Sequence, residues 1–141
     1  MIWITHPTLE VINGIGAKSM PHFLGIEFIE VGDDYMVAKM PVNQRTTQPF
    51  GILHGGASVV LAETLGSIAS AFCMDMEKYN AVGLEINANH LSPGLKGTFV
   101  YGTVRPFRIG RTVHVWSIEI KDEKGKMVCV SRLTVAIIDK K

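Results

Sequence analysis

The stretch Gln48-Pro-Phe-Gly-Ile-Leu-His-Gly-Gly-Ala-Ser-Val-Val-Leu-Ala-Glu-Thr-Leu-Gly-Ser67 is the segment around which the rest of this chain is organised. It begins as a loop, because Pro49 and Gly51 both favour turns. From Ala57 to about Cys73 most residues are small or apolar, and apolar side chains recur at three- and four-residue steps. This periodicity predicts one long helix. Because the helix is apolar on most of its sides, we expect it to lie buried at the centre of the fold.

Glu63 is the only formally charged residue between Arg45 and Asp75. A single carboxylate on an apolar helix is costly unless it has partners or a function. Ser67 lies one helical turn further on, so a water or a substrate could be held between the two side chains. Gly55-Gly56 leaves the backbone N–H groups at the helix start unobstructed. This combination indicates acyl chemistry, in which an oxyanion needs N–H donors; the alternative is a carboxylate that points into solvent.

Two segments resemble a known family. Gln48 to Ala57, followed by Leu61-Ala-Glu-Thr-Leu-Gly-Ser67, is similar to the central-helix motif of hotdog-fold acyl-CoA thioesterases. Val82-Gly-Leu-Glu-Ile-Asn-Ala-Asn-His90 resembles the next strand in the branch that contains 1,4-dihydroxy-2-naphthoyl-CoA thioesterase and the proofreading thioesterase of siderophore synthesis. The resemblance runs from Met1-Ile-Trp3 to Ser131-Arg-Leu-Thr134. It implies an α+β hotdog fold and hydrolysis of aromatic acyl-CoA thioesters, of the naphthoyl or benzoyl type, as in menaquinone biosynthesis.

The resemblance also implies catalytic roles. Glu63 would act as general base or as nucleophile, and the sequence leaves both open. The Gly55 N–H, at the positive end of the helix dipole, would polarise the thioester carbonyl. Gln48 and His54 would orient the thioester, and Ser67 would help to hold the water. A structural alternative for His54 is that it only caps or packs at the helix start.

Coenzyme A is expected, by the same resemblance, to lie on the later strands as part of the substrate, with no separate cofactor. The residues that would contact it are Gly83, His90, Leu91, Ser92, Pro93, Arg108, Ile109, Gly110, Arg111, Thr112 and Val113. Two guanidinium groups around Gly110 suit phosphate; the alternative is a solvated hairpin end. Close relatives tend to place an arginine where this chain reads Leu-Ser-Pro at residues 91–93, so that phosphate contact is either missing here or supplied by Arg108 or Arg111 instead.

Two other functions fit the same fold. A dehydratase or hydratase of acyl thioesters pairs a histidine with the acid, and Gln48, where such an enzyme needs a base, counts against it. A non-catalytic acyl-CoA binding module has no need of a buried acid, so Glu63 counts against that reading. Candidates for the acyl pocket, which ordinary core packing explains equally well, are Phe50, Ile68, Phe72 and Met74.

Composition limits the remaining possibilities. The 141 residues predict a single domain, 1–141, and the net charge of +1 gives no bulk attraction to nucleic acid or membrane. A hydrophobic share of 47% with only 19% charged residues favours surface buried between subunits. Cys73 and Cys129 form no C-x-x-C pair, and the five histidines show no metal-ligand spacing, so we expect reduced thiols and no metal. No signal peptide and no membrane-spanning stretch is expected, which predicts a cytoplasmic protein.

The catalytic groups themselves predict an oligomer. Gly55 and Glu63 are eight residues apart, which is about 12 Å along a helix axis. One helix therefore reaches both sides of a thioester carbonyl with difficulty. Two antiparallel helices, each offering its start to the other's glutamate, would make two equal sites in a symmetric dimer. We expect a homodimer with shared sites, assembled further into a dimer of dimers.

The remaining pattern predicts a short helix and six strands around the long helix. Thr8 is a candidate cap for the short helix, which we expect to end at Gly16. His90 and His114 fall on strands, where satisfied structural histidines are the simplest reading. The predicted ranges are 9–15 and 54–74 for the helices and 23–31, 35–40, 81–89, 98–108, 112–121 and 127–138 for the strands, with a loop over 17–22.

Overall fold

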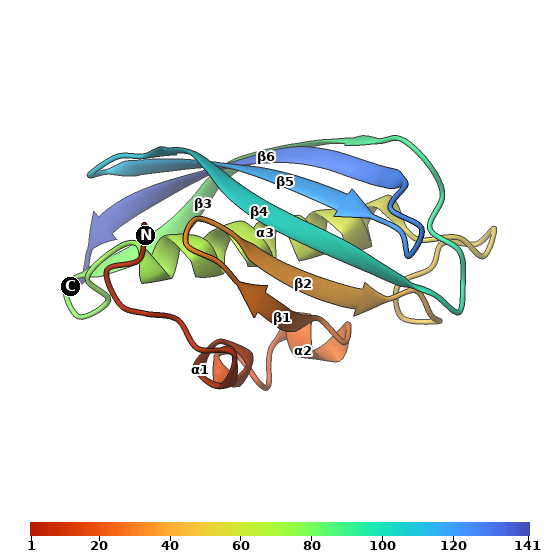
Figure 1. Ribbon diagram of the computed structural model, residues 1–141, viewed down its shortest axis with the longest axis horizontal. Helices are drawn as coiled ribbons and strands as arrows, with labels where there is room; N and C mark the ends of the chain where they lie inside the picture. The colour runs from red at the N-terminus through yellow and green to blue at the C-terminus, as the bar shows by residue number, and fades with distance from the viewer.

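The computed structural model describes all residues, 1–141. One antiparallel sheet curves around the long helix α3 (Gly55–Phe72), and two short helices lie on the side away from most of the sheet (Figure 1). The strand order is β1-β2-β4-β5-β6-β3, so β1 and β3 form the two edges. This arrangement confirms the predicted α+β hotdog fold. The other elements are α1 (Leu9–Gly14), α2 (Met20–Phe23), β1 (Glu27–Val31), β2 (Met36–Pro41), β3 (Tyr79–His90), β4 (Phe99–Ile109), β5 (Val113–Lys121) and β6 (Met127–Asp139).

The predicted elements end within a few residues of the observed ones, except near α2. We predicted a loop over 17–22 and a strand from residue 23, but Met20–Phe23 forms a helical turn and β1 begins only at Glu27. Pro21 stands in the first turn of α2, where its missing N–H is not needed. The sequence therefore carried a helix-start signal that we read as loop.

The N-terminal segment covers the edge strand β1. Thr8 caps α1 as predicted, because its hydroxyl accepts a hydrogen bond from the Val11 N–H. Asn13 then pairs with the backbone of Phe28 as a strand would: its amide donates to the Phe28 carbonyl at 2.9 Å and its oxygen accepts the Phe28 N–H at 2.8 Å. A side chain thus satisfies backbone groups that an open edge would leave free.

The core is one cluster of 26 buried hydrophobic residues between α3 and the inner face of the sheet. Two glycines allow the close approach. A Cβ on Gly66 of α3 would lie 2.4 Å from the Leu133 side chain, and one on Gly102 of β4 would lie 2.6 Å from that of Leu65. Larger residues there would push the helix away from the sheet.

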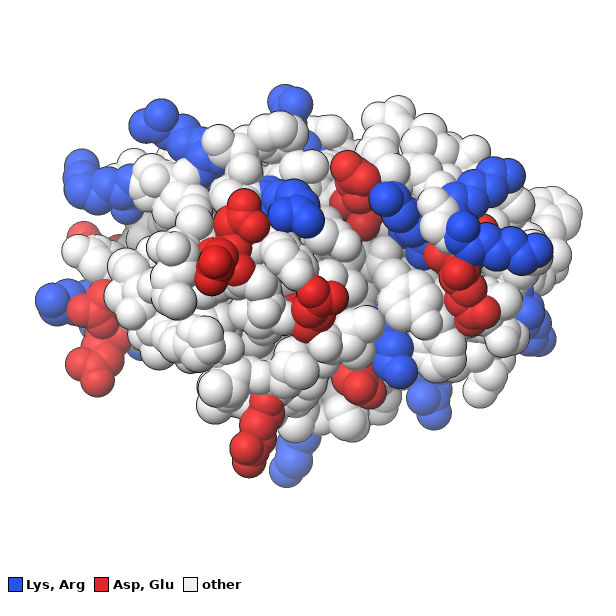
Figure 2. All heavy atoms as spheres, in the orientation of Figure 1, with Lys and Arg blue, Asp and Glu red and all other residues white.

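By length and composition alone, α3 could cross a membrane, since its mean hydropathy is 1.3 over 18 residues. Our expectation that no stretch of the chain is long and apolar enough to do so was therefore wrong. Half of that window is buried inside the protein, and the sheet packs against it, as in a core helix. Figure 2 shows lysine and arginine interspersed with aspartate and glutamate over the visible face. Cys73 and Cys129 are free and buried, which confirms that they are not paired with each other.

Candidate active site

The start of α3 carries one free backbone donor. His54 caps the helix, because its ring nitrogen Nδ1 accepts the Gly56 N–H at 2.8 Å. The backbone N–H of His54 donates to the Thr46 carbonyl at 2.7 Å. A ring nitrogen that accepts carries no proton, so the remaining proton of neutral His54 lies on Nε2. The Gly55 N–H has no hydrogen-bond partner in the chain. The structural alternative for His54, that it caps the helix, is observed, and the role in orienting the thioester stays a prediction. The cap leaves Gly55 as the unoccupied N–H of the helix start.

A pocket of about 420 Å³ opens at this helix start. Six of the predicted site residues line it: Gln48, Gly55, His90, Leu91, Ser92 and Pro93. The His90 ring lies against Gly55, since a Cβ on that glycine would come within 2.8 Å of the ring nitrogen Nε2. The chain therefore brings the loop before α3 together with the end of β3.

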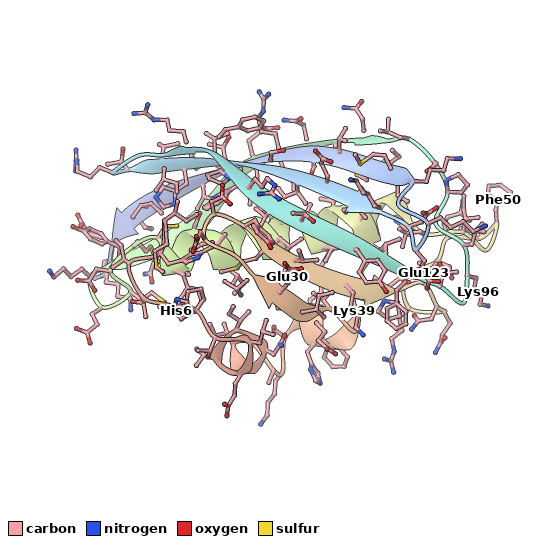
Figure 3. The ribbon with its side chains drawn as sticks, in the orientation of Figure 1. His6, Glu30, Lys39, Phe50, Lys96 and Glu123 are labelled. Carbon is pink, nitrogen blue, oxygen red and sulfur yellow. The ribbon has the colours of Figure 1, made fainter.

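The loop before α3 is a small hairpin. Gln48 donates its N–H to the Ile52 carbonyl, and its side-chain oxygen accepts the Phe50 N–H. Phe50 at the tip is 89% exposed and extends outward at the end of the molecule where α3 begins (Figure 3). Of the other candidates for an acyl pocket, Phe72 and Met74 belong to the buried core, which leaves the half-buried Ile68.

Glu63 lies in a second region, two turns further along α3. Its side chain is half-buried and forms neither an ion pair nor a hydrogen bond within the chain. Its carboxylate packs against the backbone of β3, where a Cβ on Gly83 would lie 2.8 Å from Oε2. Ser67 is one turn away and also half-buried. The structure therefore brings Glu63, Ser67 and Gly83 together, with the carboxylate left free to act on another molecule.

A β-bulge in β3 creates the contact between Gly83 and Glu63. In the pairing with β6, Gly83 faces Val135 and Glu85 faces Thr134, so Leu84 is the extra residue. Strict alternation along 81–89 predicts that Val82, Leu84, Ile86 and Ala88 share one face, and the structure shows that this prediction is wrong. Val82 and Leu84 are 44% and 61% exposed, whereas Ile86 and Ala88 pack against the core. The bulge reverses the faces, and a glycine inside a strand was the available signal for it.

The turn between β4 and β5 holds the remaining predicted residues, from Arg108 to Val113. The Gly110 N–H closes the turn by donating to the Val113 carbonyl at 2.9 Å, and Arg108 and Arg111 are exposed without ion pairs. Figure 1 shows this turn at the end of the sheet opposite the start of α3. Val113 and Val82 both pair with Ala136, so the turn lies near Gly83.

The predicted site residues thus fall into two groups. The first surrounds the helix start and the end of β3; the second contains Glu63, Ser67, Gly83 and the β4–β5 turn. Gly83 and His90 are seven residues apart on one strand, or roughly 23 Å. A single chain does not bring these two groups into one site.

Two further polar features escaped the sequence analysis. Ser58 is buried in the first turn of α3 and lines the pocket at the helix start. Ser70 is also buried, and its oxygen accepts the Trp116 indole N–H at 2.7 Å and contacts the His114 ring at 3.0 Å. Burial lowers the pKa of His114, against a smaller opposing effect of a backbone hydrogen bond at Gly110. The expected structural role of His114 agrees with these contacts.

No group of three or more possible metal ligands occurs in the structure.

Residues 50–129, more than half of the chain, match the thioesterase superfamily. The chain therefore belongs to this superfamily and is a hydrolase of acyl-CoA thioesters. Relatives named as hydrolases, esterases or thioesterases favour this function over the dehydratase and the binding module.

Three similar proteins illustrate the relationship. The chain is 52% identical over 138 residues to 1,4-dihydroxy-2-naphthoyl-CoA hydrolase of Escherichia coli (strain K12), which covers 98% of this chain and 100% of that protein. It is 45% identical over 138 residues to the proofreading thioesterase EntH of Cronobacter turicensis, with 98% and 99% covered. The crystal structure of a mutant of thioesterase PA1618 from Pseudomonas aeruginosa superimposes with a TM-score of 0.96 at 46% identity, over 99% of this chain and 100% of that one.

Proposed function

We propose that this protein hydrolyses aromatic acyl-CoA thioesters at sites that are shared between two copies of the chain. In each site the Gly55 N–H of one copy holds the carbonyl oxygen. Glu63 of the other copy attacks the carbonyl carbon directly or activates a water that does so. The observation that carries this proposal is the separation of an unpartnered N–H, in a pocket, from an unpartnered carboxylate further along the same continuous helix.

The sheet edge supports the dimer. Strand β3 is 12 residues long and pairs only with β6, so its other side presents free backbone groups. Exposed edges of this length are normally covered in native proteins. If two copies join their β3 edges antiparallel, the sheet continues across the dimer and the two α3 helices also run antiparallel.

Such a dimer unites the two groups of predicted residues. The His90 end of one β3 would lie beside the Gly83 region of the other, so Pro93 of one copy would approach the Arg108–Val113 turn of its partner. Coenzyme A would then contact both copies. On the outer side of the sheet, exposed Val82, Leu84 and Phe107 support a further association into a dimer of dimers.

A cavity beside α3 supports an aromatic acyl group. It measures about 120 Å³ and lies between α3 and the N-terminal helices, with Thr64, Ile68 and Asn13 among its lining residues. This space is of the same order as the enclosed cavity of roughly 150 Å³ that is known to hold benzene, so one aromatic ring of the acyl group would enter it. The similarity to 1,4-dihydroxy-2-naphthoyl-CoA hydrolase supports an aromatic substrate of the menaquinone pathway. Free buried cysteines agree with a reducing compartment, and we propose the cytoplasm.

The catalytic acid is tested by Glu63→Gln. We expect a folded protein whose kcat for benzoyl-CoA falls by about 10²–10⁴, measured by thiol release. A fatty acyl-CoA assayed beside benzoyl-CoA tests the acyl class, and wild type should prefer the aromatic thioester. Near-normal turnover by the folded variant would refute the role of Glu63.

The shared site is tested by mixing two inactive chains. Gly55→Pro removes the N–H donor and Glu63→Ala removes the acid, so each pure dimer lacks one half of both sites. A mixed dimer would contain one intact site, and some activity should return after subunit exchange. An inactive mixed dimer, with its composition verified by differently tagged chains, would show that each site is built within one chain.

A further inference from the structure

Ser58 is a polar residue of the pocket at the helix start for which the proposed mechanism has no role. It is only 1% exposed, yet it lines the pocket together with Gly55. Its hydroxyl forms no hydrogen bond within the chain. The buried Ser70 differs, because its oxygen accepts the Trp116 N–H and contacts His114.

An unpaired hydroxyl in this position is unusual. A serine within a helix commonly returns its O–H to the carbonyl four residues earlier, which here belongs to His54. That carbonyl instead accepts the N–H groups of Ala57 at 3.0 Å and Ser58 at 3.3 Å. Ser131 Oγ is the one fully buried side-chain oxygen without a partner, so the Ser58 hydroxyl keeps access to the pocket that it lines, where a ligand can accept its hydrogen bond.

Helix geometry turns the hydroxyl toward the free N–H. Ser58 follows Gly55 by three residues, so the two lie on the same face of α3. Side chains of a helix lean toward its N-terminus, which carries the Ser58 oxygen toward the Gly55 amide. The Gly55 N–H and the Ser58 hydroxyl therefore face the same part of the 420 Å³ pocket.

We propose that the Ser58 hydroxyl is a second hydrogen-bond donor to the thioester carbonyl oxygen, beside the Gly55 N–H. This inference rests on the proposed function. When the nucleophile forms a bond to the carbonyl carbon, the C=O electron pair moves onto oxygen, and both hydrogen bonds strengthen. When the C=O bond re-forms, the C–S bond breaks and coenzyme A leaves as the thiolate, which takes up a proton. Ser58 keeps its own proton throughout.

The test compares Ser58→Ala with Ser70→Ala, a matched change at a buried serine whose oxygen is already partnered. Ser58→Ala should lower kcat for benzoyl-CoA about 10- to 100-fold, change KM less than threefold, and leave Tm equal to or above that of wild type. Ser70→Ala should lower Tm while kcat per folded enzyme stays within twofold. A lowered Tm for Ser58→Ala, or a kcat within twofold of wild type, would overturn the proposal.

Binding of two stable analogues gives a second readout. In one, a methylene replaces the thioester sulfur of benzoyl-CoA and the carbonyl remains; the other is the benzyl thioether of coenzyme A, which has no carbonyl. Ser58→Ala should weaken the ketone about 5- to 10-fold and leave the thioether within twofold. Equal effects on both would overturn the proposal. If Glu63→Gln is inactive and Ser58→Ala is fully active, only this inference fails; a fully active Glu63→Gln would overturn the proposed function itself.

Discussion

Replacing Gly83 with alanine should displace the carboxylate of Glu63, the proposed catalytic acid, without changing its chemistry. The added Cβ would lie 2.8 Å from Glu63 Oε2, whereas ordinary contacts begin at 3.4 Å, so the carboxylate must retreat by about 0.6 Å. A displacement near 1 Å can cost roughly 10²-fold in rate, which predicts a kcat about 10- to 100-fold lower. Gly83 has no positive φ, so alanine brings no backbone strain. The fold and the KM for benzoyl-CoA should therefore be kept.

Steady-state thiol release, with Tm measured in parallel, decides this prediction. Gly14→Ala is the matched control, because nothing lies within 4 Å of its added Cβ, and its kcat should not change. Glu63→Asp shortens the acid by one methylene, so adding Gly83→Ala to that variant should cost much less than it does in wild type. The resemblance assigned Gly83 to coenzyme A binding. A raised KM with unchanged kcat in Gly83→Ala would support that assignment and refute the positioning argument.

Three further predictions concern other parts of the chain. Arg108→Ala and Arg111→Ala should raise KM with little change in kcat, since phosphate contacts bind ground and transition states alike; unchanged KM in the double variant would place phosphate recognition elsewhere. Because burial lowers the pKa of His114, the unfolded chain binds more protons there than the folded chain does below about pH 6.5. The free energy of unfolding should therefore decrease as the pH is lowered below that value, by at most about 1.4 kcal/mol per pH unit. Urea unfolding from pH 7.5 to 5 should show this slope reduced in His114→Gln, and equal slopes would contradict it. Burial raises the pKa of Cys73 to about 12, so a thiol-blocking reagent at pH 8 should modify it only after denaturation; rapid modification of the native protein would disagree.

Local patterns were sufficient for most of the fold. The three- and four-residue periodicity that begins after Gly55-Gly56 predicted α3, and alternation with short turns predicted the long strands β4, β5 and β6. The errors arose where a single residue changes the local geometry. Pro21 started a helical turn that we read as loop, and the bulge at Leu84 reversed the faces of β3. Alternation assumes an uninterrupted pleat, so it misplaces every residue on one side of a bulge.

The candidate site was harder to predict because its members meet only in three dimensions. The resemblance named Gln48, Gly55 and His90, and the pocket at the helix start contains all three. No sequence pattern indicated that Gly83 would lie against Glu63, or that the Ser58 hydroxyl would lack a partner. These facts depend on how closely α3 packs on the sheet, which is decided by contacts between residues that are distant in sequence.

If the proposed site is correct, the length of α3 explains why the chemistry requires two copies of the chain. A helix that fills the centre of the sheet must run along most of it, so its free N-terminus and a residue at its middle are about 12 Å apart. The strand beside it separates Gly83 from His90 by a still larger distance. Moving the acid nearer to the helix start would not help, because an acid there would compete with the substrate oxygen for the same positive helix end. The proposed two-fold axis would avoid this conflict, because it would place the middle of one helix beside the start of the other and let each region keep the environment that its proposed role requires.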